Sequence, residues 1–303
     1  MELRQLRYFV AIAQAGTMTL AASQLNIAQP ALSRSIKKLE DELGSLLLIR
    51  HERGIRLTES GQQLLGNARQ ILAQADDAKN AVAGIEQLQR GQVRIGLPAM
   101  LGSYFFPPLL MAFRARYPGL SIEVVDAGTV SIRQMLQQGT LDLGVVVKED
   151  GLAGLASEPL LKEEMVCCMA QGHPLTHNAA ISAEQFLNYQ QIGFHSGYFH
   201  QRFIEHMGQH TLRAPNKVIT TNLIPLIKAV VSQGEAIAML LKLVIQTNDG
   251  IIIRSFAPAE YIHLHIAWHP ERYLSHANQA FRQFLIEQLS TPYTSTERDL
   301  LTQ

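Results

Sequence analysis

The sequence has few cysteines and no long apolar run, the features that mark disulfide-bonded secreted proteins, zinc proteins and membrane-spanning proteins. Among its 303 residues are only two cysteines, Cys167 and Cys168, which are adjacent and therefore suit neither a disulfide framework nor a zinc site. Both lie in an apparent strand, where neighbouring side chains point to opposite faces. We interpret them as two buried thiols, with a redox sensor as the alternative. No stretch approaches the roughly 20 apolar residues that span a bilayer. We therefore expect a cytoplasmic protein.

The chain also has no excess of charge, with 26 basic and 26 acidic residues. A net charge of zero gives no global sign of a nucleic-acid partner, so any such sign must be local. The opening residues MELRQLRYFV carry Arg4 and Arg7 within an amphipathic pattern, which argues against a secretory signal peptide. A hydrophobic share of 47% and a charged share of 17% predict a soluble globular protein, and the length predicts two or more domains.

Motifs of common enzymes are missing as well. The sequence contains no H-E-x-x-H, no G-x-S-x-G and no phosphate-binding glycine loop. Among the eleven histidines, His263 and His265 would share one face of a strand, which leaves a two-histidine metal site as an alternative, although no nearby carboxylate completes it. We predict that the chain is not an enzyme and uses no cofactor or metal. The competing interpretation is a solute-binding or catalytic α/β protein with an incidental helical head.

What the sequence does contain is, first, a helical N-terminus. Apolar residues over positions 3–13 recur at helical spacing, and Gly16 ends this run. In the polar break that follows, Thr19 is expected to cap a second helix over positions 20–25.

A third helix follows a short turn at positions 26–28. Pro30 suits its first turn, where a missing N–H costs nothing, and Gly44 ends it. Its inward face is expected to consist of Leu32, Ile36, Leu39 and Leu43. Two short helices around such a turn form a helix-turn-helix.

The outward face of the third helix is polar and partly basic. Gln29, Ser33 and Lys37 are spaced by four and therefore align, with Pro30 and Arg34 beside them. They occupy the N-terminal half, where a recognition helix meets base edges. Glutamine suits adenine and arginine suits guanine. The alternative is an ordinary solvated face, which most helices have.

A basic hairpin is predicted next, in the segment LLLIRHERGIRLTESG. Arg50, Arg53 and Arg56 recur at intervals of three, and Gly54 provides a turn between strand-like residues. The pattern indicates a wing that places arginines against phosphates. Positions 1–58 carry eight basic and five acidic residues, a net charge of three positive. The sign and placement of these charges matter more than their number.

The run AASQLNIAQPALSRSIKKLEDELGSLLLIRHERGIRLTESG resembles the LysR-type transcriptional regulators over about forty contiguous residues. The resemblance implies a winged helix-turn-helix that binds promoter DNA, and a small-molecule effector. Two departures stand out. Ala28 stands where the family often has a capping serine or threonine, so another group must satisfy the third helix's N-terminus. Leu48 stands where phenylalanine is usual, which we expect to change packing only.

After Thr58 the sequence predicts a long helix with an a/d heptad seam. The alanines of this seam favour the close approach of a second copy, and the resemblance implies dimerisation through the same helix. The alternative is packing on the protein's own core. The seam comprises Leu64, Ala68, Ile71, Ala75, Ala78, Val82 and Ile85.

The remaining two-thirds alternates strands with helices, which predicts a parallel α/β sheet. The expected strands span 92–97, 120–125, 141–147, 165–169, 191–194, 217–220, 236–240 and 262–268. The expected helices span 104–117, 132–138, 183–187, 198–206, 224–232 and 278–289.

The motifs YPGLSIEVVDAGT, LQQGTLDLGVV and SQGEAIAMLL resemble the family's effector domain, so the resemblance covers essentially the whole chain. It implies a two-lobed fold like that of periplasmic binding proteins, with crossovers near residues 162 and 265. The predicted divisions are a winged helix-turn-helix over 1–58, a linker helix over 59–90 and an effector domain over 91–303. Lobe I would comprise 91–162 and 266–303, and lobe II 163–265.

Small molecules bind such folds where strands end and helices begin, and free N–H groups there favour an anion. Thr129 matches a family position that contacts the effector's carboxylate in some relatives, although N-capping is an equal alternative for Thr129 and for Thr221. Leu241-Lys242 stands where the family commonly has proline after a strand, so the rim of the cleft is expected to differ. The predicted effector-binding residues are Ala99, Met100, Ser103, Thr129, Phe194, His195, Tyr198 and Asn222.

We therefore predict a regulator, activator or repressor, that binds DNA as a dimer or as a dimer of dimers. RNA polymerase is a candidate partner.

Overall fold

A computed structural model describes residues 1–51, 54–82, 91–152, 154–195 and 215–290, together with Phe199, Phe203, Ile204 and Met207. The N-terminal unit contains three helices, α1 (Leu3–Ala15), α2 (Met18–Gln24) and α3 (Gln29–Leu43). As predicted, Gly16 ends α1, in the left-handed conformation with φ 69°. The cap of α2 was predicted wrongly. Thr17, not Thr19, accepts the hydrogen bond from the backbone N–H of Leu20, so α2 begins two residues earlier.

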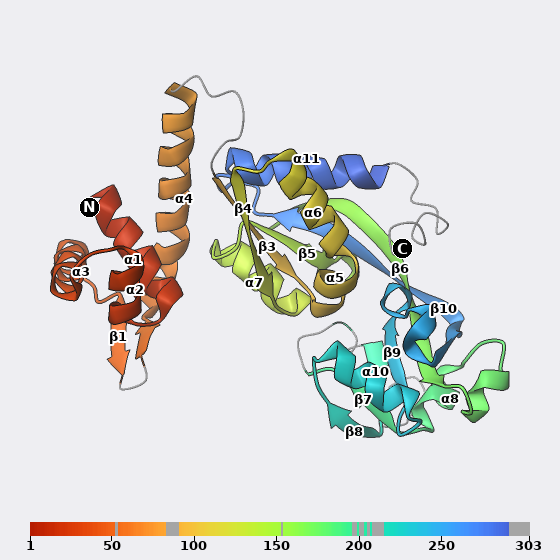
Figure 1. Cartoon of the computed structure of the whole chain (residues 1–303). Helices are drawn as coiled ribbons and strands as arrows, with labels where there is room; N and C mark the ends of the chain where they lie inside the picture. The colour runs from red at the N-terminus through yellow and green to blue at the C-terminus, as the bar shows by residue number, and fades with distance from the viewer. Residues whose placement is uncertain are drawn as a thin grey trace.

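The three helices enclose a small apolar core that holds α3 in place. Leu32, Ile36 and Leu39 on α3 are buried against Phe9 and Ile12 of α1 and its neighbours, as the spacing predicts. The fourth predicted member, Leu43, is 41% exposed at the helix end. The opposite face of α3 is therefore left to solvent, on the side of the unit farthest from the α/β body (Figure 1).

The predicted wing is a two-stranded antiparallel hairpin of β1 (Leu48–His51) and β2 (Gly54–Leu57). It docks on the turn between α1 and α2, because the N–H of Ile55 donates to the carbonyl of Gly16 over 2.8 Å. A Cβ at position 54 would meet the same carbonyl oxygen at 2.8 Å, so this approach requires glycine. The contact fixes the hairpin relative to α3.

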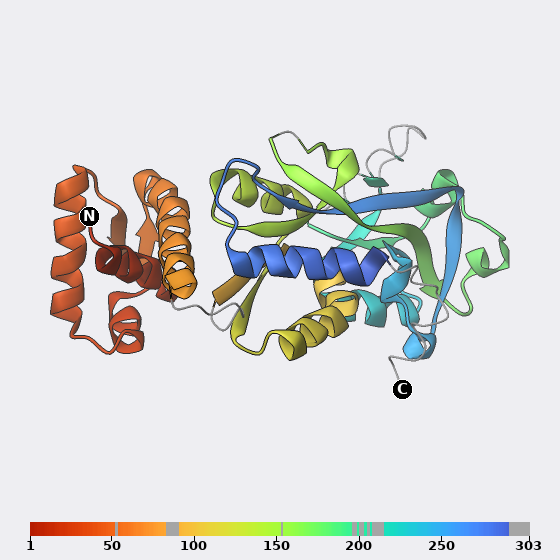
Figure 2. The same ribbon diagram turned by 90° about the horizontal axis from the view of Figure 1, so that it is seen from above.

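The long helix α4 (Glu59–Val82) connects the N-terminal unit to the α/β body and stands between them in Figures 1 and 2. Thr58 begins it, since its hydroxyl oxygen accepts a hydrogen bond from the N–H of Gly61 over 2.9 Å. With 24 residues it is about 36 Å long. The predicted linker residues 83–90 lie outside the described part of the chain.

The body contains a six-stranded sheet in the order β4-β3-β5-β10-β6-β9. Its strands are β3 (Gly91–Leu97), β4 (Leu120–Asp126), β5 (Leu143–Val147), β6 (Ala156–Ala170), β9 (Ala238–Leu241) and β10 (Ile251–Trp268). A wholly parallel sheet was a wrong prediction: β3, β4 and β5 are parallel, whereas β10 pairs antiparallel with β5 and β6, and β6 with β9. The cause is connectivity. The chain leaves the first group of strands through β6 and returns through β10 in the opposite direction.

The strands β6 and β10 are far longer than predicted, at 15 and 18 residues. The predicted crossover positions 162 and 265 lie within them, close to the pairing of Lys162 with His263. The register shifts between Leu264 and His265, and again between Ser255 and Glu260. Beyond the crossover lies a second group of elements, which includes the parallel pair β7 (Gln191–Gly193) and β8 (Lys217–Thr220).

Helices cover the sheet. α5 (Ala99–Tyr104), α6 (Phe106–Arg116) and α11 (His276–Ser290) pack on the large core, and α7 (Thr129–Gln138) covers the other face beside β5 (Figure 1). The helix predicted over 104–117 is α6, which begins two residues later than predicted. The short helix α5 before it was not predicted, and the chain turns between the two at Phe105. The far lobe carries α8 (Ala183–Leu187) and α10 (Ile224–Ser232), both with the predicted bounds.

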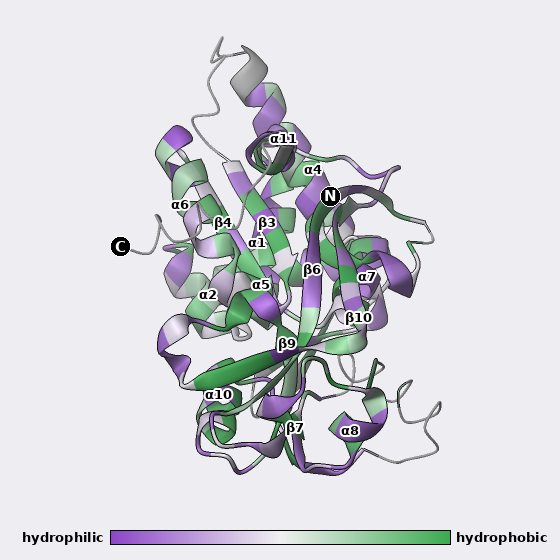
Figure 3. Cartoon of the chain, turned by 90° about the vertical axis from the view of Figure 1, so that its right-hand side faces the viewer, coloured by the Kyte–Doolittle hydropathy of each residue, from purple (hydrophilic) through white to green (hydrophobic). Residues whose placement is uncertain are grey.

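Of the helix predicted over 198–206, the structure describes only Phe199, Phe203 and Ile204. Short 3-10 turns complete the fold: η1 (Lys148–Asp150), η2 (Pro174–His177), η3 (Lys242–Val244) and η4 (Thr247–Asp249). Hydrophobic residues concentrate on buried strands such as β9 (Figure 3). Within the described ranges, the search for a helix of membrane-spanning length and hydropathy found none.

Candidate DNA-contacting surface and effector cavity

The outward edge of α3 carries the side chains predicted to read DNA. Gln29, Pro30, Arg34 and Lys37 are exposed, and Ser33 is half-buried. The guanidinium of Arg34 folds back along the helix, with its Nε donating to the carbonyl of Pro30 over 3.4 Å. This bond is long, so the side chain can leave it for a stronger acceptor.

The N-terminus of α3 needs less capping than predicted. Ala28 is the N-cap and offers no side-chain acceptor. Pro30 has no N–H, however, and the N–H of Ala31 already donates to the carbonyl of Ala28 over 2.9 Å. The backbone and one proline therefore replace the serine or threonine cap, and the end of α3 that would face a duplex stays unobstructed by a capping side chain.

The wing contributes one described arginine to the surface. Arg56 is exposed in β2, opposite the exposed Ile49 of β1. Arg50 lies in β1 opposite Ile55, and its side chain falls outside the described part. Arg53, also predicted to contact phosphates, lies in the undescribed tip.

The predicted heptad seam on α4 divides into an inner and an outer part. Ala68 is 0% exposed inside the core of its own N-terminal unit, with Leu64 and Ile71 partly buried against that core. For these three positions the structure favours the alternative of packing on the chain's own core. Ala75 is half-buried and Ala78 is exposed. Of the last two seam positions, the side chain of Val82 and all of Ile85 lie outside the description.

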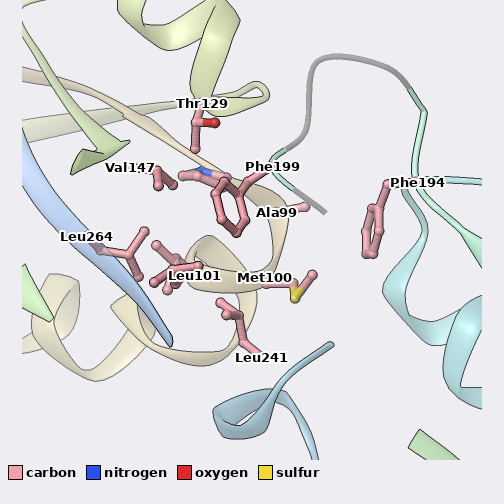
Figure 4. A pocket seen from close by; sticks show the side chains of 11 residues that line it. Ala99, Met100, Leu101, Thr129, Val147, Phe194, Phe199, Leu241 and Leu264 are labelled. Carbon is pink, nitrogen blue, oxygen red and sulfur yellow. The ribbon is translucent and has the colours of Figure 1, made fainter. Parts of the chain in front are cut away.

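A small apolar cavity of about 20 Å³ lies where the strands of the body end (Figure 4), which is room for about one water molecule. It is lined by Pro98, Ala99, Met100, Leu101, Thr129, Val147, Phe194, Phe199, Leu241, Ile262 and Leu264. Four predicted effector residues, Ala99, Met100, Thr129 and Phe194, are brought together here. Ala99 and Met100 lie in the first turn of α5, whose N-cap is Pro98.

The other predicted effector residues do not line this cavity. Ser103 and His195 are exposed, and Asn222 is half-buried, with its Oδ1 accepting a hydrogen bond from the N–H of His195 over 3.2 Å. Tyr198 lies outside the described residues. The hydroxyl oxygen of Thr221 accepts a hydrogen bond from the N–H of Leu223 over 3.1 Å. Leu223 itself is the N-cap of α10, so the capping alternative does not hold for Thr221.

Sequence reasoning missed the apolar wall that the strands provide. Val147 and Leu241 are the last residues of β5 and β9, and Leu264 faces them from β10. Taken singly they read as ordinary core residues. Their position at strand ends was the only available signal. The departure from the family at Leu241-Lys242 falls on this wall, where the ammonium of Lys242 pairs with Glu164 over 3.3 Å.

Among the described residues of this lining, Thr129 alone carries a hydroxyl, amide or charged group. It is the first residue of α7, not the N-cap, which is Gly128, so the capping alternative does not hold. Its hydroxyl bonds to Oδ2 of Asp150 over 3.2 Å. Arg133, one turn along α7, donates to the backbone carbonyls of Asp150 and Gly151. The threonine is thus positioned by the turn η1 that follows β5.

The histidine pair of β10 does not converge on a common point. His263 Nδ1 lies 2.5 Å from Oε1 of Glu149, whereas His265 Nδ1 lies 3.1 Å from the hydroxyl of Ser157. A carboxylate does lie beside His263, contrary to expectation. Burial alone would raise the pKa of Glu149, but hydrogen bonds from His263 and from the backbone of Glu149 itself, together with the charge of His263, lower it. Among the described residues, the search for three or more metal-ligating side chains found no group.

Cys167 and Cys168 are fully buried in β6, as interpreted from the sequence. Burial raises the pKa of both thiols well above the ordinary value. Since the thiolate is the reactive form, this environment argues against the redox alternative.

Comparison with known proteins covers both parts of the chain. Residues 3–62 match the family model described as "Bacterial regulatory helix-turn-helix protein, lysR family", and residues 86–290 match "LysR substrate binding domain". The regulator CfxR of Cupriavidus necator is 29% identical over 94% of this chain and 91% of that protein. The nitrogen assimilation regulatory protein nac of Klebsiella aerogenes is 42% identical, but the match spans only about half of either chain, 54%. A full-length OxyR variant from Pseudomonas aeruginosa has the same fold, with a TM-score of 0.74 at 24% identity, covering 96% of this chain and 95% of that one.

Proposed function

Because this chain belongs to the LysR family of transcriptional regulators, we propose that it binds specific promoter DNA through α3 and that a small molecule in the cavity modulates this binding. The observation that carries the proposal is the outward edge of α3, which is polar, partly cationic and not covered by any part of the chain that the structure describes. Within this proposal the protein acts in the cytoplasm.

The edge of α3 and the wing would contact different parts of the DNA. Gln29, Ser33 and Arg34 reach base edges in the major groove, where amide and guanidinium groups distinguish adenine and guanine. Phosphates are contacted by Lys37 and by the wing arginines Arg50, Arg53 and Arg56. Phosphate contacts position the protein and supply most of the salt-dependent affinity, whereas base contacts supply the specificity.

A dimer follows from the energetics of reading DNA with one short helix. Each good base contact discriminates by roughly 1–3 kcal/mol, so two copies on a two-fold axis are needed to read an operator with precision. The part of α4 left for a partner begins at Ala75 and Ala78, because Ala68 is already buried within its own chain. We extend this interface to Val82 and Ile85. A dimer of dimers, and contact with RNA polymerase, are further parts of the proposal.

The effector is proposed to be a small carboxylate with an apolar body. Thr129 begins α7, so the free N–H groups of that helix end and the threonine hydroxyl can receive an anion. To bind there, the ligand carboxylate displaces Asp150 from Thr129. Met100, Phe194 and Leu241 would then pack on its hydrocarbon part.

The cavity must open for such a ligand, since about 20 Å³ holds about one water molecule. Parting of the two lobes about the long strands β6 and β10 provides the space. The effector changes promoter binding only if the open and closed arrangements bind it with different affinity.

A gel-shift assay tests the proposal. The full chain, incubated with fragments of its source genome at stated salt, is expected to retain a specific promoter fragment in the presence of excess random DNA. Equal retention of all fragments would contradict sequence-specific recognition. Retention of none would favour a solute-binding protein.

A further inference from the structure

The linker helix α4 touches the α/β body at the C-terminal end of α7. The guanidinium Nη1 of Arg69 donates a hydrogen bond to the carbonyl oxygen of Thr140 over 3.1 Å. One turn earlier, a Cβ at Gly66 would meet the carbonyl oxygens of Gly139 and Gln138 at 2.8 and 2.9 Å. The two backbones are therefore in direct contact, which only glycine at position 66 permits.

The opposite end of α7 reaches the effector cavity. Thr129, the first residue of the helix, lines the cavity, and Gly139 ends the helix in the left-handed conformation with φ 72°. Ten residues make a rod about 15 Å long. A single helix thus joins the cavity to α4.

α7 packs on the face of the sheet opposite the large core. Its inward side chains Ile132 and Leu136 belong to a small cluster of five buried residues, separate from the large core on which α5, α6 and α11 pack. Beneath them the sheet presents Gly96 and Gly144, where a Cβ would meet Ile132 at 3.1 and 2.4 Å. Ile132 and Leu136 therefore pack directly on a glycine strip of the sheet, formed by Gly96 and Gly144, so the helix shifts only together with these two side chains.

Charged groups surround the contact with α4. Arg94 Nε lies 3.1 Å from Glu123 Oε1, and Asn278 donates to Asp142 Oδ2 over 3.2 Å. Burial, and then the neighbouring charge of Arg94, lower the pKa of Arg69 to about 10, so Arg69 stays charged at neutral pH. Asp142 precedes β5, whose last residue Val147 lines the cavity, so this strand joins the same two places.

We propose that α7 couples the effector cavity to the DNA-binding unit. Displacement of Thr129 moves the helix along the glycine strip and changes the seating of Gly139 and Thr140 against Gly66 and Arg69 on α4. Because α4 packs on α1, the change reaches the unit that carries α3. The coupling rests on the proposed function for its biological signal, but neither effector nor operator is needed to test it.

The test perturbs the cavity by substitution and measures amide hydrogen exchange in α4, on the full chain. Ala99→Phe places a ring larger than the cavity in it and forces its walls apart, and Thr129→Val is a second, milder perturbation that removes the bond to Asp150. We expect both to raise the exchange rate of α4 amides at 64–72 at least about threefold, and Gly66→Ala to do the same by breaking the contact itself. Asn67→Ala, an exposed neighbour on α4, is the matched control and is expected to leave exchange unchanged.

The double variant Ala99→Phe with Gly66→Ala distinguishes coupling from coincidence. Once the contact is broken, filling the cavity should add nothing to the α4 exchange rate. Two results would overturn the coupling. One is exchange in α4 at the wild-type rate in both cavity variants, and the other is additive effects on that rate in the double variant. Retention of promoter DNA is scored separately with the wild-type chain, so its failure would overturn the proposed function and leave the exchange result intact.

Discussion

The outer edge of α3 and the effector cavity are assembled in different ways. The edge consists of neighbours on one helix, whose side chains project outward because Leu32, Ile36 and Leu39 hold the other side inward. The cavity draws on α5, α7 and the ends of several strands, and the described part of its wall is apolar except at Thr129. A surface made by one helix depends on local spacing, whereas a cavity made by many elements depends on how those elements meet.

The largest effect is expected from the support of α3. Leu39→Ala deletes a fully buried side chain and should lower the free energy of unfolding of the N-terminal unit by about 2–5 kcal/mol. Urea unfolding followed by circular dichroism measures it, with the exposed Lys38→Ala as the control. A loss as small in Leu39→Ala as in Lys38→Ala would mean that the edge does not depend on this core.

The next effect separates base reading from phosphate binding. Arg34→Ala should weaken binding to specific DNA by about 1–3 kcal/mol and relax specificity at one base pair. Arg56→Ala should weaken binding to all sequences and lower by about 1 the slope of the logarithm of the binding constant against the logarithm of the salt concentration. Gel shifts on specific and random duplexes at several salt concentrations measure the binding free energies and their salt dependence. If Arg34→Ala weakened both duplexes equally, its assignment to base edges would be wrong.

A smaller effect is expected at the cavity. Thr129→Val keeps the shape and removes the hydroxyl, so the affinity for a carboxylate found by thermal-shift screening should fall by about 0.5–1.5 kcal/mol. Dimerisation, followed by sedimentation, should not change. Calorimetry that returns the wild-type affinity would reject Thr129 as a ligand contact.

The smallest effect concerns the ion pair of Glu149 with His263. The pKa of Glu149 is lowered in the folded state, so its contribution to stability is present above the unfolded pKa and is lost as the pH falls through the folded pKa. The carboxylate is 40% exposed, which limits the contribution to well under about 1 kcal/mol. Glu149→Gln should therefore flatten the acid limb of the stability curve slightly. An unchanged limb would show that the pair contributes nothing measurable.

Spacing and turn residues alone were enough to predict much of the N-terminal unit: three of the four inward residues of α3, the hairpin and the end of α1 at Gly16. These features depend on contacts between near neighbours, so the local pattern carries them. The motif resemblance added the family, which the matched models confirm. Even here Thr17, not Thr19, caps α2, because both threonines offer the same chemistry and only the backbone path selects one.

Tertiary structure decided the rest. Antiparallel pairing of β10 follows from the return of the chain to the first lobe, which no periodicity of apolar residues encodes. Burial of Ala68 depends on how α4 lies against α1, and the meeting of Val147, Leu241 and Thr129 depends on where three distant strand and helix ends converge. The sequence predicts that an apolar side chain will be buried, because burial depends on its own chemistry. Which residues it contacts depends on how the helices and strands pack.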